Sequence, residues 1–64
     1  MVTINGEEQA AAGQTVAAHL AQAGYNTARV VVELNGDILP KEQYGQTRLQ
    51  DGDRVEIVCF MGGG

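Results

Sequence analysis

Residues 15–36 read TVAAHLAQAGYNTARVVVELNG, and this stretch decides the fold because it contains a helix followed directly by a strand. The hydroxyl of Thr15 can cap the N-terminus of a helix. The apolar side chains that follow recur at helical spacing: Val16, Leu20 and Ala23. Gly24 supplies the left-handed residue that commonly ends a helix. We therefore predict one helix, with one apolar face, over residues 16–23.

The strand after this helix is predicted from Arg29 to Leu34. It places Val30, Val32 and Leu34 on one side, and Arg29, Val31 and Glu33 on the other. The pair Asn35-Gly36 then halts the strand. The pattern indicates a strand that turns one face to the core.

The chain before the helix predicts a hairpin. Val2-Thr3-Ile4 alternates apolar and polar residues, and Asn5-Gly6 follows, a pair that tolerates positive φ and favours a tight turn between antiparallel strands. The second arm, about Glu7 to Ala12, alternates poorly, and Gly13 breaks it. The register of this hairpin therefore stays open.

The segment after Gly36 is less regular. Asp37-Ile38-Leu39 is a short strand or a turn, and Pro40 suits the first position of a helical turn through Lys41 to Tyr44. An irregular crossing follows, and Asp51-Gly52-Asp53 forms a turn. Although this triplet is similar to a fragment of a calcium loop, the other ligand positions are missing, so we expect a plain turn.

A final strand is predicted from Arg54 to Met61. One side carries Val55, Ile57, Cys59 and Met61, and the other carries Glu56, Val58 and Phe60. Because Cys59 shares the parity of Val55 and Ile57, we expect its thiol to lie in the core as a small apolar group rather than to take part in sulfur chemistry.

The order of these elements predicts an α+β fold. A helix between strands of one sheet acts as a crossover packed on one face, so we expect a mixed sheet with one helix lying across it. That is the ubiquitin-like β-grasp arrangement. The chain has 64 residues, which we divide into one domain over residues 1–61 and a flexible glycine tail over residues 62–64.

Composition excludes several classes of function. The formal net charge is −4, the wrong sign for neutralising a nucleic-acid backbone. No apolar run reaches the roughly 20 residues of a spanning helix, and no charged leader precedes one, so we expect a soluble cytoplasmic protein. One cysteine and one histidine cannot by themselves build a zinc site, and no catalytic constellation or bound cofactor is predicted. His19 has no acid or nucleophile one turn further on, so we expect a side chain on the helix flank.

The tail Gly62-Gly63-Gly64 is the feature that folding explains least, because glycines lose the most conformational entropy on ordering and bury nothing. Without Cβ atoms it can thread a narrow channel of a partner. Its one functional group is the α-carboxylate of Gly64; transfer of AMP from ATP would activate that carboxylate, and a sulfur nucleophile could then leave a thiocarboxylate. A frayed tail is the plainer alternative, but the strand that runs straight into the glycines favours a carrier.

Two apolar side chains beside the tail, Val58 and Phe60, fall on the face opposite the inward set. If both side chains are exposed to solvent, they form a patch on which a partner could dock. Alternatively, the helix edge or the irregular crossing covers them. Both possibilities remain open from the sequence.

Several motifs together are similar to the ThiS-type sulfur carrier proteins of thiamin biosynthesis, and the resemblance spans essentially the whole chain. The motifs are Ile4-Asn5-Gly6, Ala12 to Val16, Val32 to Gly36 with Ile38 and Pro40, Gln50 to Asp53, and Phe60 to Gly64. Gly63 and Gly64 match the functional terminus of that family. Gly62 is an additional glycine.

The resemblance implies a carrier that is not itself an enzyme. A ThiF-like activating enzyme would use ATP to adenylate Gly64, a sulfur-relay protein would supply sulfur, and a ThiG-like thiazole synthase would receive it. The expected partner-binding residues are Val58, Phe60, Met61, Gly62, Gly63 and Gly64. The small subunit of molybdopterin synthase is a related alternative, and a β-grasp binding module whose tail is never activated is an alternative of another class.

Overall fold

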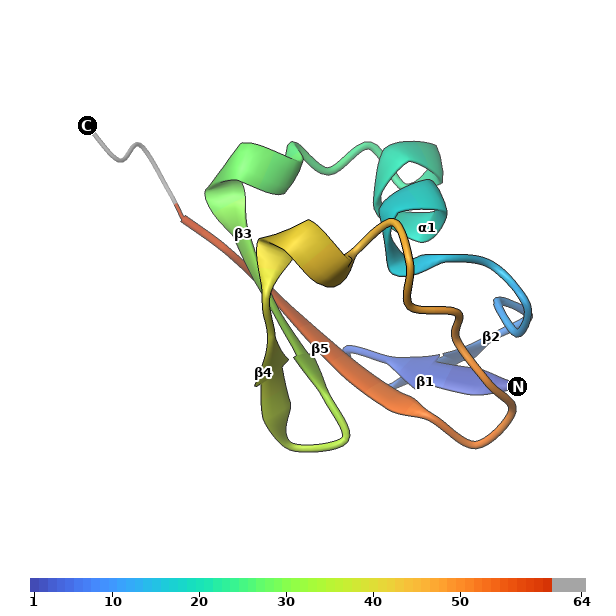
Figure 1. Ribbon diagram of the computed structural model, residues 1–64. Helices are drawn as coiled ribbons and strands as arrows, with labels where there is room; N and C mark the ends of the chain where they lie inside the picture. Colours follow the sequence, from blue (N-terminus) through green and yellow to red (C-terminus); the bar gives the residue numbers. More distant parts are fainter. Residues whose placement is uncertain (61–64) are drawn as a thin grey trace.

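The computed structural model describes residues 1–60 and shows one five-stranded mixed sheet with helical segments on one side (Figure 1). The strand order is β2-β1-β5-β3-β4. The central strand β5 (Arg54–Cys59) runs parallel to β1 (Val2–Ile4) and antiparallel to β3 (Val30–Leu34). The predicted mixed sheet is confirmed, and the last strand of the chain lies at its centre. Within residues 1–60, no helix is long and apolar enough to span a bilayer.

The first hairpin joins β1 to β2 (Glu7–Gln9), and its register pairs Ile4 with Glu7. Asn5 and Gly6 both have positive φ, 51° and 85°, as a two-residue turn of the type that matches strand twist requires. The second strand is shorter than the arm predicted to reach Ala12, because residues beyond Gln9 leave the sheet to approach the helix.

The helix α1 (Val16–Gln22) forms at the predicted place. The Thr15 hydroxyl accepts a hydrogen bond from the amide of Ala18 at 3.1 Å. At the other end, Gly24 has a φ of +86°, and the amide of Tyr25 returns to the carbonyl of Leu20 at 2.9 Å. Both helix signals in the sequence therefore act as predicted.

Two short 3₁₀ segments, η1 (Thr27–Arg29) and η2 (Lys41–Gln43), lie on the same side of the sheet as α1 (Figure 1). Strand β4 (Asp37–Leu39) pairs with β3 across the Asn35-Gly36 turn, so the segment left open as strand or turn is a strand. Pro40 caps η2 with an extended ψ of 144°; it precedes the helical turn instead of occupying its first position.

The core lies between the sheet and this helical layer. Its buried side chains include one inward set from the strands and one from the helix: Val2, Ile4, Val30, Val32, Val55, Ile57, Val16 and Leu20. Ala11, Tyr44 at the end of η2, and Leu49 from the irregular crossing complete it. Since each of these side chains was apolar and in phase with its element, or lies on a segment pressed against the helix, burial of apolar area accounts for the fold.

The prediction that Cys59 lies in the core is wrong, because the thiol is exposed. Parity does place it on the same face as Val55 and Ile57. Burial fades along β5, from 2% exposed at Val55 to 7% at Ile57, and is lost at Cys59, the last residue of the strand. Parity fixes the direction of a side chain, but a second layer must also cover it.

His19 is more buried than a helix-flank side chain was expected to be, at 8% exposed. The segment that leaves β2 passes beside it, so Ala10, Ala11 and Gln14 share a small hollow with His19. This contact depends on the path of a loop, which periodicity does not predict.

Candidate functional site

The candidate site begins where β5 ends. Cys59 is the last residue of the strand, and the amide of Phe60 still donates a hydrogen bond of 2.8 Å to the carbonyl of Arg29. The chain therefore keeps the direction of the central strand up to the last described residue. The predicted site residues Met61, Gly62, Gly63 and Gly64 lie outside the described residues.

Val58 and Phe60 are both exposed, by 52% and 53%. The question left open by the sequence is answered: neither the helix nor the crossing covers them. Val58 alternates with the buried Ile57, so it faces away from α1, and it lies directly opposite Val31 in the register of β5 and β3. Another exposed apolar side chain, Ile38, lies on the same face as Val58, 69% exposed, opposite Glu33.

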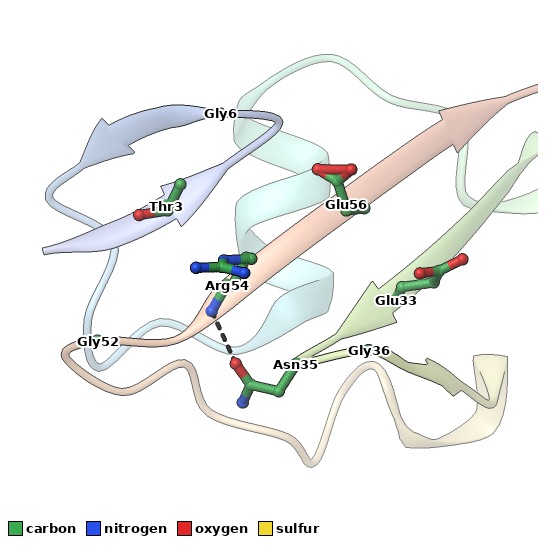
Figure 2. Close-up of a pocket in the computed structure, with 8 residues that line it drawn as sticks. All are labelled: Thr3, Gly6, Glu33, Asn35, Gly36, Gly52, Arg54 and Glu56. Atoms are coloured by element: carbon green, nitrogen blue, oxygen red, sulfur yellow. Dashed lines mark hydrogen bonds between the residues drawn. The ribbon is translucent and has the colours of Figure 1, made fainter.

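The face of the sheet away from α1 carries an open hollow of about 560 Å³ at the end far from Phe60 (Figure 2). The side chains of Thr3, Glu33, Arg54 and Glu56 line it. Turn glycines, which carry no side chain to close it, form its rim: Gly6, Gly36 and Gly52. Polar and charged side chains reach into the hollow, and it lies open to solvent instead of enclosing a cavity.

Glu33 and Glu56 lie directly opposite each other across β3 and β5. Cross-strand partners have Cβ atoms about 5 Å apart, and the two carboxylates point in different directions (Figure 2). Arg54 lies two residues before Glu56 in the sequence, but in the sheet it pairs with Thr3 on the neighbouring β1 (Figure 2). Within residues 1–60 the one ion pair joins the amino group of Met1 to Asp51, so neither glutamate forms an ion pair there.

Sequence reasoning missed this acidic pair. Alternation put both glutamates on the outer side of their strands, which was the available signal. What alternation does not give is the register, and a shift of the register would have placed Glu33 opposite another residue.

Two asparagine side chains fasten the turns of the hairpins to β5. The Asn5 amide oxygen accepts a hydrogen bond from the amide of Ile57 at 2.7 Å, and its nitrogen reaches the Ile57 carbonyl at 3.4 Å. On the opposite flank, Asn35 accepts from the amide of Arg54 at 2.9 Å. The central strand, which leads to the tail, is therefore held by side chains from both neighbours.

The turn at Asp51-Gly52-Asp53 is stabilised within the protein. Asp53 accepts hydrogen bonds from Asn35 at 3.1 Å and from the amide of Gln50 at 2.8 Å. In the part of the chain that the structure describes, no three His, Cys, Asp or Glu side chains gather as a group that could hold a metal ion.

A family model described as the ThiS family matches residues 2–64. The chain belongs to the ThiS family. This match includes the glycine tail as well as the folded part. The fold agrees: the crystal structure of the thiamine biosynthesis protein ThiS from Geobacter metallireducens superposes with a TM-score of 0.76 at 39% identity, covering 98% of this chain and 97% of that one. The predicted β-grasp fold and the predicted family are thus confirmed.

Two relatives of this ThiS-family chain differ in length. The sulfur carrier protein ThiS of Escherichia coli is 39% identical over 56 residues, which cover 88% of this chain and 85% of that protein. The thiazole synthase of Paramagnetospirillum magneticum is 47% identical over 64 residues, which cover 98% of this chain. In that protein, and in a second thiazole synthase, the chain spans only 20% of the relative's length.

Proposed function

We propose that this ThiS-family chain is a sulfur carrier of thiamin biosynthesis, whose Gly64 carboxylate is adenylated and then converted to a thiocarboxylate. The observation that carries the proposal is the family match, which runs through residue 64 and so includes the glycine tail. The fold supports it, because the central strand leads directly toward that tail.

Both chemical steps involve the α-carboxylate of Gly64. A carboxylate oxygen of Gly64 attacks the α-phosphorus of ATP, the bond to the β-phosphate oxygen breaks, and pyrophosphate leaves. Hydrosulfide then attacks the carbonyl carbon, and AMP leaves with the oxygen that joined it to the carbon. When a persulfide of the relay protein attacks instead, an acyl disulfide forms, and a thiol then bonds to the relay sulfur as a disulfide and releases the thiocarboxylate. The product is the thiocarboxylate of Gly64. ATP is consumed by the activating enzyme and is not a resident cofactor of the carrier.

The carrier in this proposal supplies the reacting carboxylate and a docking face, while its partners supply the catalysis. These partners are an adenylating enzyme similar to ThiF, a sulfur-relay protein, and a thiazole synthase similar to ThiG. The thiazole synthase of P. magneticum supports the last of them, because a segment similar to this chain forms part of that protein.

Val58, Phe60 and Met61 are proposed to contact a partner while Gly62, Gly63 and Gly64 enter its active site. Exposure of Val58 and Phe60 supports this assignment. Their place does too, since an enzyme that holds Gly64 has to come within about 13 Å of Phe60, the reach of residues 61–64 in extended form.

The test is incubation with the activating enzyme of the same organism, ATP and sulfide, followed by the mass of the C-terminal peptide. The proposal expects the replacement of one oxygen atom by sulfur on Gly64. Failure to form the product with an enzyme that activates another ThiS protein would favour a β-grasp binding module whose tail is not activated.

A further inference from the structure

Two turns of the sheet contain the same dipeptide, Asn5-Gly6 and Asn35-Gly36, in the same conformation. The asparagines have φ of 51° and 52°, and the glycines that follow them have φ of 85° and 91°. Asparagine before glycine loses its side-chain amide most readily, because glycine has no side chain to hinder the approach of its backbone nitrogen to the asparagine Cγ atom. The protein therefore carries two sites at which spontaneous deamidation can occur.

The reaction needs only water as a co-reactant. The backbone nitrogen of the glycine attacks Cγ of the asparagine and gives up its proton, the bond from Cγ to Nδ2 breaks, and ammonia leaves. A succinimide ring remains, and water opens it at one of its two carbonyl carbons. Opening at one carbon gives aspartate, and opening at the other gives isoaspartate, in which the main chain runs through the side-chain carbon. Either product adds one negative charge at neutral pH.

In both turns, hydrogen bonds hold the side-chain amide. Asn35 Nδ2 donates to Asp53 Oδ1 at 3.1 Å, and Asn35 Oδ1 accepts from the amide of Arg54 at 2.9 Å (Figure 2). Asn5 accepts from the amide of Ile57 at 2.7 Å and donates to its carbonyl at 3.4 Å. Each amide turns toward the glycine nitrogen only when such bonds open, so the reaction rate depends on the free energy of local opening.

The two turns differ in what has to open. The side-chain bonds of Asn5 are partly buried, and they end on Ile57, a core residue within β5. The side-chain bonds of Asn35 are exposed, and they end on the last residue of the 51–53 turn and on the first residue of β5. Opening an exposed turn costs less free energy than opening the middle of the central strand. Asn35 is therefore the asparagine that reacts first.

The carboxylate formed at position 35 faces a second carboxylate. An oxygen atom takes the place of the Nδ2 that donates to Asp53 Oδ1, so a hydrogen bond becomes a contact between like charges. The side chain of Asp53 is also held from its other oxygen, because Oδ2 accepts from the amide of Gln50 at 2.8 Å. The repulsion therefore acts on the 51–53 turn, whose Gly52 amide donates to the carbonyl of Met1 at 2.8 Å.

We propose that Asn35 is a modification site of this chain, which deamidates faster than Asn5 and whose new carboxylate destabilises the 51–53 turn through Asp53. The reaction takes place on the folded part of the chain and is independent of the chemistry at Gly64. Asn5-Gly6 is the internal reference, because it is the same dipeptide at the same φ in the same molecule.

The first test follows both asparagines during one incubation of the full chain in mildly alkaline buffer at physiological temperature. Trypsin cleaves after Arg29 and Lys41, so Asn5 and Asn35 fall in separate peptides. Mass spectrometry with fragmentation gives the extent of deamidation at each asparagine. The expected rate at Asn35 is about tenfold that at Asn5. Equal rates, or a faster reaction at Asn5, would overturn the proposal.

The second test measures the repulsion between the two carboxylates. Asn35→Asp reproduces the charge of the product and should lower the melting temperature by roughly 5 °C. Adding Asp53→Asn should recover most of this loss, because an amide and a carboxylate then face each other again with donor and acceptor exchanged. Asn5→Asp is the matched control, which Asp53→Asn should not rescue. The double variant is informative even if Asn35→Asp alone does not fold. A melting temperature of Asn35→Asp equal to that of the unsubstituted protein, or no recovery in the double variant, would overturn the proposal.

Discussion

The amide of Phe60 donates a hydrogen bond of 2.8 Å to the carbonyl of Arg29, the residue that precedes β3. This bond extends the pairing of the central strand by one residue beyond Cys59. It fixes the point from which the reach of residues 61–64 is counted, about 13 Å in extended chain. The C-terminal end of the central strand is therefore held by β3 on one side, since the pairing of β5 with β1 ends at Val55.

Deleting Gly63 and Gly64 should leave the free energy of unfolding nearly unchanged, because the buried core ends at Ile57 and these glycines add no side chain to it. Adenylation should be lost, since the remaining carboxylate retreats by roughly 7 Å in extended chain. Thermal melts and ATP–pyrophosphate exchange on the same preparations measure both. An early melt would make the glycines structural, and normal exchange would show that the length of the tail is unimportant.

Replacing Gly63 by valine keeps the length of the tail and should also abolish adenylation. A β-branched side chain restricts the backbone and widens the tail in a channel shaped for hydrogen atoms. Gly63→Ala is the graded control and should retain part of the activity. Pyrophosphate exchange at the unsubstituted rate in Gly63→Val would contradict threading through a narrow channel.

Cys59→Ala should change the free energy of unfolding by no more than about 0.5 kcal/mol, the usual range for an exposed position. This is less than expected for a thiol in the core. Sulfur transfer to Gly64 should persist, because the proposed chemistry uses the terminal carboxylate alone. Chemical denaturation and a transfer assay test the two halves; loss of transfer in a folded variant would give the thiol a role.

The features that the sequence predicts correctly are those set by residues adjacent in the chain. The caps at Thr15 and Gly24 and the turn at Asn5-Gly6 each follow from residues adjacent in sequence, and all three form as predicted. The prediction that Cys59 is buried was wrong, because alternation gives the direction of a side chain but does not show whether another layer of the protein covers it. The acidic pair of Glu33 and Glu56 needed the register of two strands that are distant in the chain.

The segment between β4 and β5 was the other gap. Tyr44, at the end of the predicted helical turn, and Leu49, in the irregular crossing, are buried, although no periodic pattern surrounds them. Their burial depends on how the segment between η2 and β5 lies against α1, where the amide of Ala17 bonds to the carbonyl of Tyr44 at 2.9 Å. Such a contact is set by the tertiary fold.

Asn5→Gly should destabilise the protein by about 1 to 2 kcal/mol, because it preserves the positive φ and removes both side-chain hydrogen bonds to Ile57. Asn5→Ala should cost more, since alanine also resists that backbone conformation. Asn26→Ala, which removes a side-chain cap at a negative φ of −89°, is the control. Urea denaturation ranks the three. Equal stability of Asn5→Gly and the unsubstituted protein would show that the side-chain bonds contribute nothing.

In the proposed function Gly64 carries the sulfur. The most direct measurement is the mass of the Cys59→Ala protein, isolated from cells and treated with an alkylating reagent. With the one cysteine removed, a thiocarboxylate is the remaining reactive sulfur nucleophile in the chain. The expected result is a population with sulfur in place of one oxygen that gains one alkyl group, located by fragmentation on Gly64. A protein whose mass matches the unmodified sequence and stays unalkylated, from cells that hold a competent activating enzyme, would contradict it.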